Sequence, residues 1–145
     1  MEILYTAEAT ATGAGREGEV RTSDGVLHER LELPVTMGGS GDRAVNPEQL
    51  FAAGYAACFH NAVLWSARLE GLEPHGSSVT ARVGIGRQGP GFGLTVVLRV
   101  DLPGVARAAA ERIAAAAHRG CPYSRAIQGN VDVDVVLVEH DHQSL

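Results

Sequence analysis

Two cysteines in unlike settings are the residues of this chain best suited to chemistry. Cys58 lies in an apolar run, residues 49–59, whereas Cys121 lies at a turn in the segment Gly-Cys-Pro-Tyr-Ser, residues 120–124. The thiolate form of cysteine, and not the thiol, is the nucleophile. A thiol in an apolar wall, together with a second thiol at the start of another element, suggests redox chemistry on an apolar substrate.

Cys58 is reactive only if its surroundings ionise it. Burial alone raises the pKa of a thiol, so a permanent cation must approach. Arg16, which lies between Gly15 and Gly18 at the mouth of a predicted hairpin, is the best candidate from local pattern. Simpler interpretations stay open at this point, because most buried free cysteines are small core hydrophobes and a charged residue in a turn is usually solvated.

Glu48 and Cys121 also allow two interpretations each. A carboxylate in the first turn of a helix is favoured by the helix dipole whatever its role, and Glu48 follows a strong helix start. Cys121 either caps a short helix beginning at Pro122 or uses the N–H groups and positive dipole of that position to lower its pKa.

Composition narrows the classes of function. The 145 residues carry a net charge of −5 and no basic cluster, so neither nucleic acid nor an anionic membrane is expected as a partner. All 12 basic residues are arginine, which excludes Schiff-base chemistry and a phosphate-binding P-loop lysine. No apolar stretch approaches about 18 residues and no signal-peptide pattern is present, so we expect a cytoplasmic, reducing location. Cysteines there are more often catalytic, metal-binding or inert than permanently bridged.

Hydrophobic periodicity predicts one α+β domain over residues 1–145 with a mainly antiparallel sheet. A helix from Pro47 to about Glu70 is signalled by Asn46 at the cap and Gln49 three residues later, and its first half is apolar on nearly all sides, as in a central helix. A second, alanine-rich helix is predicted over 105–118. The predicted strands are 3–12, 17–22, 27–33, 79–85, 94–101 and 131–135.

Several segments match known functional motifs, but the sequence around them argues against those functions. Residues 84–89 match the dinucleotide pattern Gly-x-Gly-x-x-Gly but join two predicted strands, so we expect a hairpin turn there. No Gly-x-Ser-x-Gly elbow is present, which argues against a serine hydrolase. Three short patterns resemble pairs of metal ligands: Cys58-x-His60, His118-x-x-Cys121 and His140-x-His142. None of them repeats with the spacing of a zinc ribbon, so we expect no metal site.

The motifs around both cysteines resemble a known family. Residues 46–55 (Asn-Pro-Glu-Gln-Leu-Phe-Ala-Ala-Gly-Tyr), 57–59 (Ala-Cys-Phe), 121–124 (Cys-Pro-Tyr-Ser) and 129–133 (Gly-Asn-Val-Asp-Val) look like the organic hydroperoxide resistance (Ohr) subgroup of the OsmC-like proteins. The resemblance covers essentially the whole chain. It implies an intertwined homodimer with mainly antiparallel sheets wrapped around a long central helix plus a second helix. It also implies thiol peroxidase activity without metal or bound cofactor, with electrons drawn from dihydrolipoyl groups of lipoylated partner proteins.

The resemblance also implies roles for single residues. Cys58 resembles the peroxidatic cysteine, Cys121 the resolving cysteine, Arg16 the arginine that stabilises the thiolate, and Glu48 the carboxylate that holds this arginine. The usual Gly-Gly-Arg-Asp-Gly of the family appears conservatively as Ala-Gly-Arg-Glu-Gly at 14–18, whereas departures at 125 and 128 concern only the pocket rim or reductant docking. The apolar residues expected to contact substrate are Phe51, Tyr55, Phe59 and Phe92.

The implied cycle starts with attack of the Cys58 thiolate on the distal peroxide oxygen. The resulting sulfenic acid condenses with Cys121 to a disulfide, which an external dithiol reduces. The apolar neighbours favour alkyl or fatty-acid hydroperoxides over hydrogen peroxide. A redox sensor or small-ligand-binding protein without turnover, and a zinc-bound structural domain, are the alternatives.

Helix geometry adds a constraint on this site. Glu48 and Cys58 are ten residues apart, or about 15 Å along a continuous helix, which a glutamate side chain cannot span. Either the helix breaks near Gly54, or each site combines Cys58 of one chain with Glu48 of its partner. We favour the second arrangement.

Overall fold

The computed structural model describes residues 1–140, which form two compact units, residues 1–50 and the residues from 51 onward. The boundary falls inside helix α1 (Pro47–Leu69). The prediction of a single domain over residues 1–145 therefore stays a prediction.

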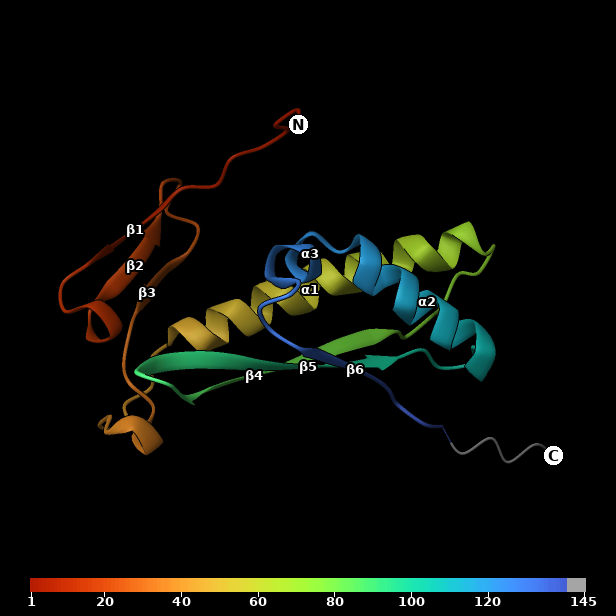
Figure 1. Cartoon of the computed structure of the whole chain (residues 1–145). Helices are drawn as coiled ribbons and strands as arrows, with labels where there is room; N and C mark the ends of the chain where they lie inside the picture. Colours follow the sequence, from red (N-terminus) through yellow and green to blue (C-terminus); the bar gives the residue numbers. More distant parts are fainter. Residues whose placement is uncertain (141–145) are drawn as a thin grey trace. The chain divides into compact units, whose positions relative to one another are not determined.

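The first unit contains a three-stranded antiparallel sheet in the order β1-β2-β3, visible in Figure 1. Its strands are β1 (Ala9–Thr12), β2 (Glu19–Thr22) and β3 (His28–Arg30), with short 3-10 helices η1 (Gly15–Glu17) and η2 (Val35–Met37). The predicted hairpin is confirmed, and Arg16 lies in η1 between its two strands. The predicted strands 3–12 and 27–33 were too long, because β2 offers partners only to residues 9–12 and 28–30.

Helix α1 begins as its sequence predicts. The backbone N–H of Gln49 donates to Asn46 Oδ1 at 2.8 Å, and the N–H of Asn46 donates to Gln49 Oε1 at 2.9 Å. These reciprocal bonds satisfy N–H groups that have no partner within the helix. The helix is continuous to Leu69, without a break at Gly54, and the chain turns at Gly71 in the left-handed region.

The second unit contains a three-stranded sheet in the order β4-β5-β6. Strands β4 (Ser78–Gln88) and β5 (Gly91–Asp101) form an antiparallel hairpin, whereas β6 (Val133–Leu137) lies parallel to β5. A parallel neighbour needs a crossover, which here consists of α2 (Arg107–Gly120) and α3 (Pro122–Ile127). Figure 1 shows α1, α2 and α3 on the same side of this sheet.

Two details of the hairpin and of β6 differ from the prediction. The Gly-x-Gly-x-x-Gly segment does lie at a hairpin, but residues 84–88 belong to β4 and only Gly89, with a positive φ of 56°, enters the turn. Strand β6 begins at Val133 instead of 131 because its pairing with β5 starts at Val96.

The core of the second unit lies between the sheet and the helices. The predicted alternation is confirmed: Val96, Leu98 and Val100 are buried, whereas Thr95 and Arg99 on the same strand are exposed. These strand residues belong to one buried cluster with side chains of α1 and α2 such as Tyr55, Phe59, Val63 and Ile113. No helix in residues 1–140 is both long enough and apolar enough to cross a membrane.

The contribution of this core can be measured with two matched leucine truncations. Leu98→Ala removes a side chain with no exposed surface and is expected to lower the free energy of unfolding by about 2–5 kcal/mol. Leu69→Ala truncates a leucine that is 74% exposed at the end of α1 and should change it by less than about 0.5 kcal/mol. Denaturant titration followed by circular dichroism measures both, and equal losses would contradict the assignment of the core.

Candidate active site

The two cysteines come together in the second unit. Cys58 lies on α1 and Cys121 lies between α2 and α3, and their Sγ atoms are 3.5 Å apart with both thiols free. Cys121 has no exposed surface, whereas Cys58 is partly exposed. A disulfide has an S–S length of about 2.05 Å, so the pair can be oxidised with a movement of about 1.5 Å. The geometry suits reversible dithiol–disulfide chemistry.

Local structure fixes Cys121 in place. Its N–H donates to the carbonyl of Ala117 at 2.8 Å, closing α2, and its carbonyl accepts from the N–H of Arg125 at 3.0 Å, opening α3. The short helix beginning at Pro122 is confirmed, but the Cys121 side chain makes no capping hydrogen bond. The absence of a side chain at Gly54 lets α3 approach α1, because a Cβ there would lie 3.3 Å from the ring of Tyr123.

Burial acts against the chemistry that Cys58 would need. It raises the pKa of the Cys58 thiol above the ordinary value of 9.0, although a backbone hydrogen bond from Tyr123 partly offsets this rise. The second thiol at 3.5 Å also disfavours ionisation of both sulfurs together. Burial within the second unit therefore disfavours the thiolate form of Cys58, and a nearby cation would offset this effect.

A buried hydrogen-bond chain that the sequence did not reveal lies beside the thiols. Tyr55 Oη and Ser124 Oγ are 2.6 Å apart, and His118 Nδ1 lies 2.9 Å from the same Ser124 oxygen. Burial raises the pKa of Tyr55. The sequence does indicate that a tyrosine on a buried helix needs a hydrogen-bond partner for its hydroxyl group. It does not indicate which residue is that partner. The chain ties α1, α2 and α3 together around Cys121.

Arg16 and Glu48 form a bidentate ion pair in the first unit. Both guanidinium nitrogens donate to the carboxylate oxygens at 2.8 Å, and the side chains are 39% and 13% exposed respectively. The hydrogen bonds from Arg16 lower the pKa of Glu48, and those to Glu48 raise the pKa of Arg16. The carboxylate thus fixes the direction of the guanidinium.

The four aromatic residues predicted to contact substrate occupy different environments. Tyr55 and Phe59 are fully buried in the core, and Phe51 packs edge-on against Tyr55 with ring centroids 6.0 Å apart. Phe92 is 64% exposed on β5, where the guanidinium of Arg87 lies 5.9 Å from its ring centroid. Contact with substrate stays a prediction for all four.

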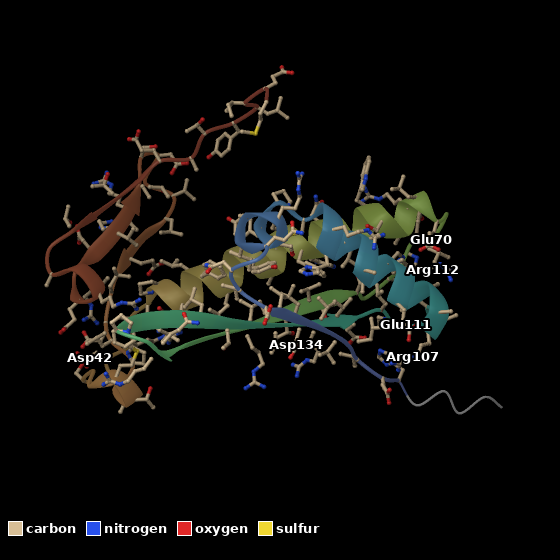
Figure 2. The ribbon with its side chains drawn as sticks, viewed as in Figure 1. Asp42, Glu70, Arg107, Glu111, Arg112 and Asp134 are labelled. Carbon is tan, nitrogen blue, oxygen red and sulfur yellow. The ribbon has the colours of Figure 1, made fainter. Side chains whose placement is uncertain are left out.

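Cys58 opens onto a groove of about 540 Å³ between α1 and α2. Most of the side chains that line this groove are apolar: Ala62, Trp65, Leu69, Ala116 and Pro122. Three polar side chains also line it: Asn61, Ser66 and Arg119. Figure 2 shows Glu70 and Arg112 together where α1 ends, and their ion pair of 2.9 Å joins α1 to α2 there.

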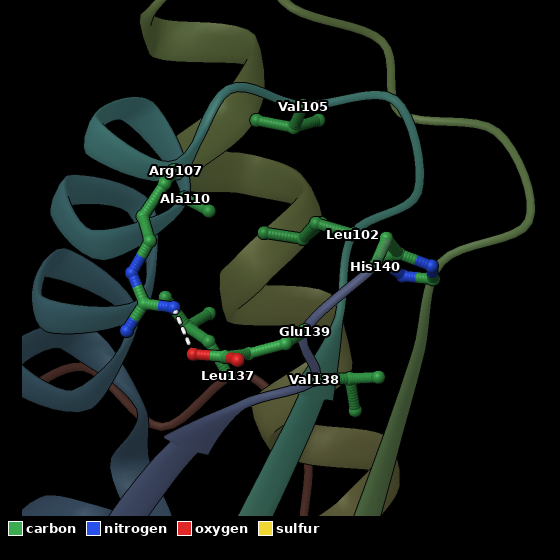
Figure 3. A pocket seen from close by; sticks show the side chains of 8 residues that line it. All are labelled: Leu102, Val105, Arg107, Ala110, Leu137, Val138, Glu139 and His140. Atoms are coloured by element: carbon green, nitrogen blue, oxygen red, sulfur yellow. Dashed lines mark hydrogen bonds and ion pairs between the residues drawn. The ribbon is translucent and has the colours of Figure 1, made fainter. Parts of the chain in front are cut away.

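A smaller hollow of about 230 Å³ lies between the start of α2 and the end of β6 (Figure 3). Arg107 and Glu139 form an ion pair of 2.7 Å on its wall, and His140 is hydrogen-bonded to Asp101. It contains no cysteine. His142 of the His140-x-His142 pattern lies outside the described residues, and within residues 1–140 no three histidine, cysteine or acidic side chains gather as metal ligands do.

The Arg16–Glu48 pair makes a pH-dependent contribution to stability. The lowered pKa of Glu48 means that this contribution is complete above pH 4.5 and is lost as the pH falls through the lower folded-state value. Glu48→Gln should lower the unfolding free energy at pH 7 by at most about 1 kcal/mol, because the pair is partly exposed. The difference in stability from the wild type, measured by thermal unfolding, should shrink below pH 4.5.

The matched control is Glu111→Gln, which breaks an exposed pair with Arg107 and should have a smaller effect on stability. A Glu48→Gln difference that does not change with pH would contradict the assignment of the Arg16–Glu48 pair.

Comparison with known proteins agrees with this geometry. Residues 39–136 match the family model described as OsmC-like protein. The chain is 47% identical over 137 residues to the organic hydroperoxide resistance protein of Xanthomonas axonopodis pv. citri, covering 94% of this chain and 96% of that one. The crystal structure of OhrB of Bacillus subtilis superposes with a TM-score of 0.87 at 40% identity, covering 94% and 100% of the two chains. A corresponding protein of Legionella pneumophila gives a TM-score of 0.88 at 44% identity, covering 95% and 100%. The α+β fold and the resemblance seen in the sequence are thus confirmed, and the chain belongs to the OsmC-like family, in its organic hydroperoxide resistance group.

Proposed function

We propose that this protein is a metal-free thiol peroxidase that reduces organic hydroperoxides to alcohols. The observation that carries the proposal is the 3.5 Å contact between a partly exposed thiol and a fully buried one. Relatives over 40% identical along nearly the whole chain are named organic hydroperoxide resistance proteins, which supports the same reaction class.

The proposed cycle uses the two sulfurs in turn. The Cys58 thiolate attacks the distal oxygen of the hydroperoxide, the O–O bond breaks, and the alkoxide leaves and takes a proton to become the alcohol. Cys58 is then a sulfenic acid. The thiol of Cys121 attacks this sulfur, water leaves, and a Cys58–Cys121 disulfide forms. The dithiol of a dihydrolipoyl group on a partner protein reduces this disulfide by exchange and is oxidised to its cyclic disulfide.

The first step needs a cation, and Arg16 is the proposed source. A guanidinium near Cys58 would stabilise the thiolate and the charge that develops on the peroxide oxygens. Because α1 is continuous from Pro47 to Leu69, Glu48 lies about 15 Å along the axis from Cys58 of the same chain. This distance is too long for both residues to act in one site of the same chain. We therefore propose a homodimer in which the partner subunit's Arg16 and the partner subunit's Glu48 complete the site around each Cys58.

The apolar surroundings of Cys58 support a preference for alkyl or fatty-acid hydroperoxides. Each CH₂ group transferred from water to an apolar contact contributes about 0.8 kcal/mol. A few such contacts, from the groove walls or from the predicted substrate-contacting aromatics, would give a preference of about tens-fold to hundreds-fold over hydrogen peroxide.

The proposed activity is tested by a hydroperoxide assay with dihydrolipoamide as electron donor. The wild type should consume cumene or linoleic hydroperoxide with sustained turnover, at a kcat/KM about tens-fold or more above that for hydrogen peroxide. Cys58→Ser should abolish this activity because it removes the nucleophile. Cys121→Ser should complete one turnover and then stall, because the sulfenic acid has no partner.

Three outcomes would count against the mechanism. Equal use of hydrogen peroxide and organic hydroperoxides would remove the argument from the apolar surroundings. Sustained turnover by Cys121→Ser with the lipoyl donor would exclude a resolving role for Cys121. Glutathione serving as well as dihydrolipoamide would remove the proposed partner.

The shared site is tested by mixing two inactive variants. Neither Cys58→Ser nor Glu48→Ala homodimers should be active at the wild-type rate, but after dissociation and reassociation a mixed dimer holds one site with both intact residues. Recovery of up to about half of the wild-type activity per mixed dimer is expected, since one of its two sites is complete. A mixture that recovers nothing, although mass spectrometry shows mixed dimers, would place Glu48 and Cys58 of one site in the same chain.

A further inference from the structure

Backbone bonds hold Cys121 to α2 and α3, but they do not hold it to α1. Its N–H donates to the carbonyl of Ala117, and its carbonyl accepts from the N–H of Arg125. Neither bond reaches α1, where Cys58 lies. The separation of 3.5 Å between the two sulfurs therefore depends on the contacts that α1 makes with this turn and with α3.

One hydrogen bond between buried hydroxyl groups joins α1 to α3. Tyr55 Oη and Ser124 Oγ are 2.6 Å apart, and the two residues are 0% and 3% exposed. Within residues 1–140, this is the only hydrogen bond between a side chain of α1 and a side chain of α3. Because both residues are buried, water does not replace either partner while the core stays closed.

This hydrogen bond and the thiol contact join the same two segments at the same spacing. Tyr55 precedes Cys58 by three residues on α1, so the two side chains are neighbours on one face of that helix. Ser124 follows Cys121 by three residues, across the first turn of α3. A bond between Tyr55 and Ser124 therefore limits how far the sulfurs can move apart.

His118 holds the same serine from α2. Its Nδ1 lies 2.9 Å from Ser124 Oγ, and its ring centroid lies 6.3 Å from that of Phe59 on α1. A serine hydroxyl has one donor and two acceptor positions, so Ser124 can bond to both Tyr55 and His118. The Ser124 side chain is thus fixed by α1 and by α2 at the same time.

The position of α3 also affects Cys58 directly. A backbone hydrogen bond from Tyr123, the residue before Ser124, reaches the Cys58 thiol. A displacement of Ser124 would therefore move this N–H group as well as the Cys121 sulfur.

We propose that Ser124 is a positioning residue for formation of the Cys58–Cys121 disulfide. Its hydrogen bonds to Tyr55 and His118 keep the Cys121 sulfur beside Cys58 while no covalent bond joins the two. All of these atoms belong to one chain and to its second unit. The inference rests on the proposed function and adds Ser124 and His118 to the residues that serve its second step.

The step that Ser124 serves needs no further reactant. Cys121 Sγ forms a bond to the sulfur of the Cys58 sulfenic acid, and the S–O bond breaks. The hydroxide leaves with the proton of the Cys121 thiol as water. The sulfurs must approach from 3.5 Å to about 2.05 Å. Loss of their alignment slows this step and leaves the sulfenic acid open to other reagents.

The variant Tyr55→Phe/Ser124→Ala removes the link without leaving a buried hydroxyl unpaired. It deletes both hydroxyl groups of the 2.6 Å hydrogen bond and keeps the aromatic ring in the core. His118 is only partly buried and can bond to water instead. The matched control is Ser77→Ala, which breaks a 2.9 Å hydrogen bond to His60 of α1 without touching α3.

The first measurement is the equilibrium of the disulfide with oxidised and reduced dithiothreitol, which involves no peroxide. Oxidised dithiothreitol takes two electrons and two protons from the thiol pair. N-ethylmaleimide labelling and mass spectrometry give the disulfide fraction. The equilibrium constant for disulfide formation should fall about tenfold in Tyr55→Phe/Ser124→Ala and about threefold in His118→Ala, because fewer hydrogen bonds hold the thiols together. It should be unchanged in Ser77→Ala.

The second measurement follows the competition between disulfide formation and trapping of the sulfenic acid. Cumene hydroperoxide is added with dimedone, which reacts with sulfenic acids, and mass spectrometry compares dimedone-labelled Cys58 with the disulfide. The ratio does not depend on how fast Cys58 is oxidised, so a change in substrate contact at Tyr55 does not affect it. It should rise about tenfold in Tyr55→Phe/Ser124→Ala, because the thiol of Cys121 is less well placed.

Wild-type values of both quantities in Tyr55→Phe/Ser124→Ala and in His118→Ala would overturn the inference. If Tyr55→Phe/Ser124→Ala does not fold, the same two measurements on His118→Ala decide the matter. Failure of hydroperoxide to oxidise Cys58 would overturn the proposed function instead, and the dithiothreitol equilibrium would still decide whether Ser124 positions the thiols.

Discussion

The proposed chemistry of this protein depends on a conflict between burial and ionisation at one sulfur. The packing of α1 against α2 and α3 brings the Sγ atoms of Cys58 and Cys121 to 3.5 Å, close enough for a disulfide. The same packing removes water from Cys58 and raises the pKa of its thiol, and so disfavours the nucleophilic form. A looser site would ionise more readily but would hold the second thiol less reliably. The fold favours proximity, and in the proposed cycle a group from outside this core stabilises the charge.

In the proposed cycle, Arg16 of the Arg16–Glu48 pair supplies the stabilising positive charge. An arginine at a turn loses side-chain entropy when it is fixed, and the two hydrogen bonds that it donates to a carboxylate hold its planar group in one orientation. The carboxylate is itself favoured at the start of α1, where the capping box of Asn46 and Gln49 defines the first turn. Arg16 keeps hydrogens beyond those given to Glu48, so it can still donate to a thiolate or a peroxide oxygen.

Local signals in the sequence predicted the elements that local interactions decide. The start of α1 followed from Asn46, Pro47 and Gln49, and the burial of alternate residues in β4 and β5 followed from their period of two. The strand ends and the parallel β5–β6 pairing did not follow, because they depend on which residues of another strand are available. The hydrogen bond of Tyr55 to Ser124 joins residues 69 positions apart, and no local pattern encodes such a pair. The cysteine pair was predicted only because a family resemblance supplied the long-range information.

The unequal exposure of the two sulfurs assigns them different reaction partners in the proposed cycle. Cys58 lines the groove and can meet reagents from solution, both the oxidant and the reductant. Cys121, with no exposed surface, can react only with a sulfur already beside it. Burial therefore protects Cys121 from direct oxidation by the hydroperoxide, since oxidation of a cysteine requires an accessible thiolate. It also keeps the second thiol next to the sulfenic acid, where rapid condensation limits further oxidation of Cys58. The burial that makes Cys58 harder to ionise is thus the property that makes its oxidation reversible.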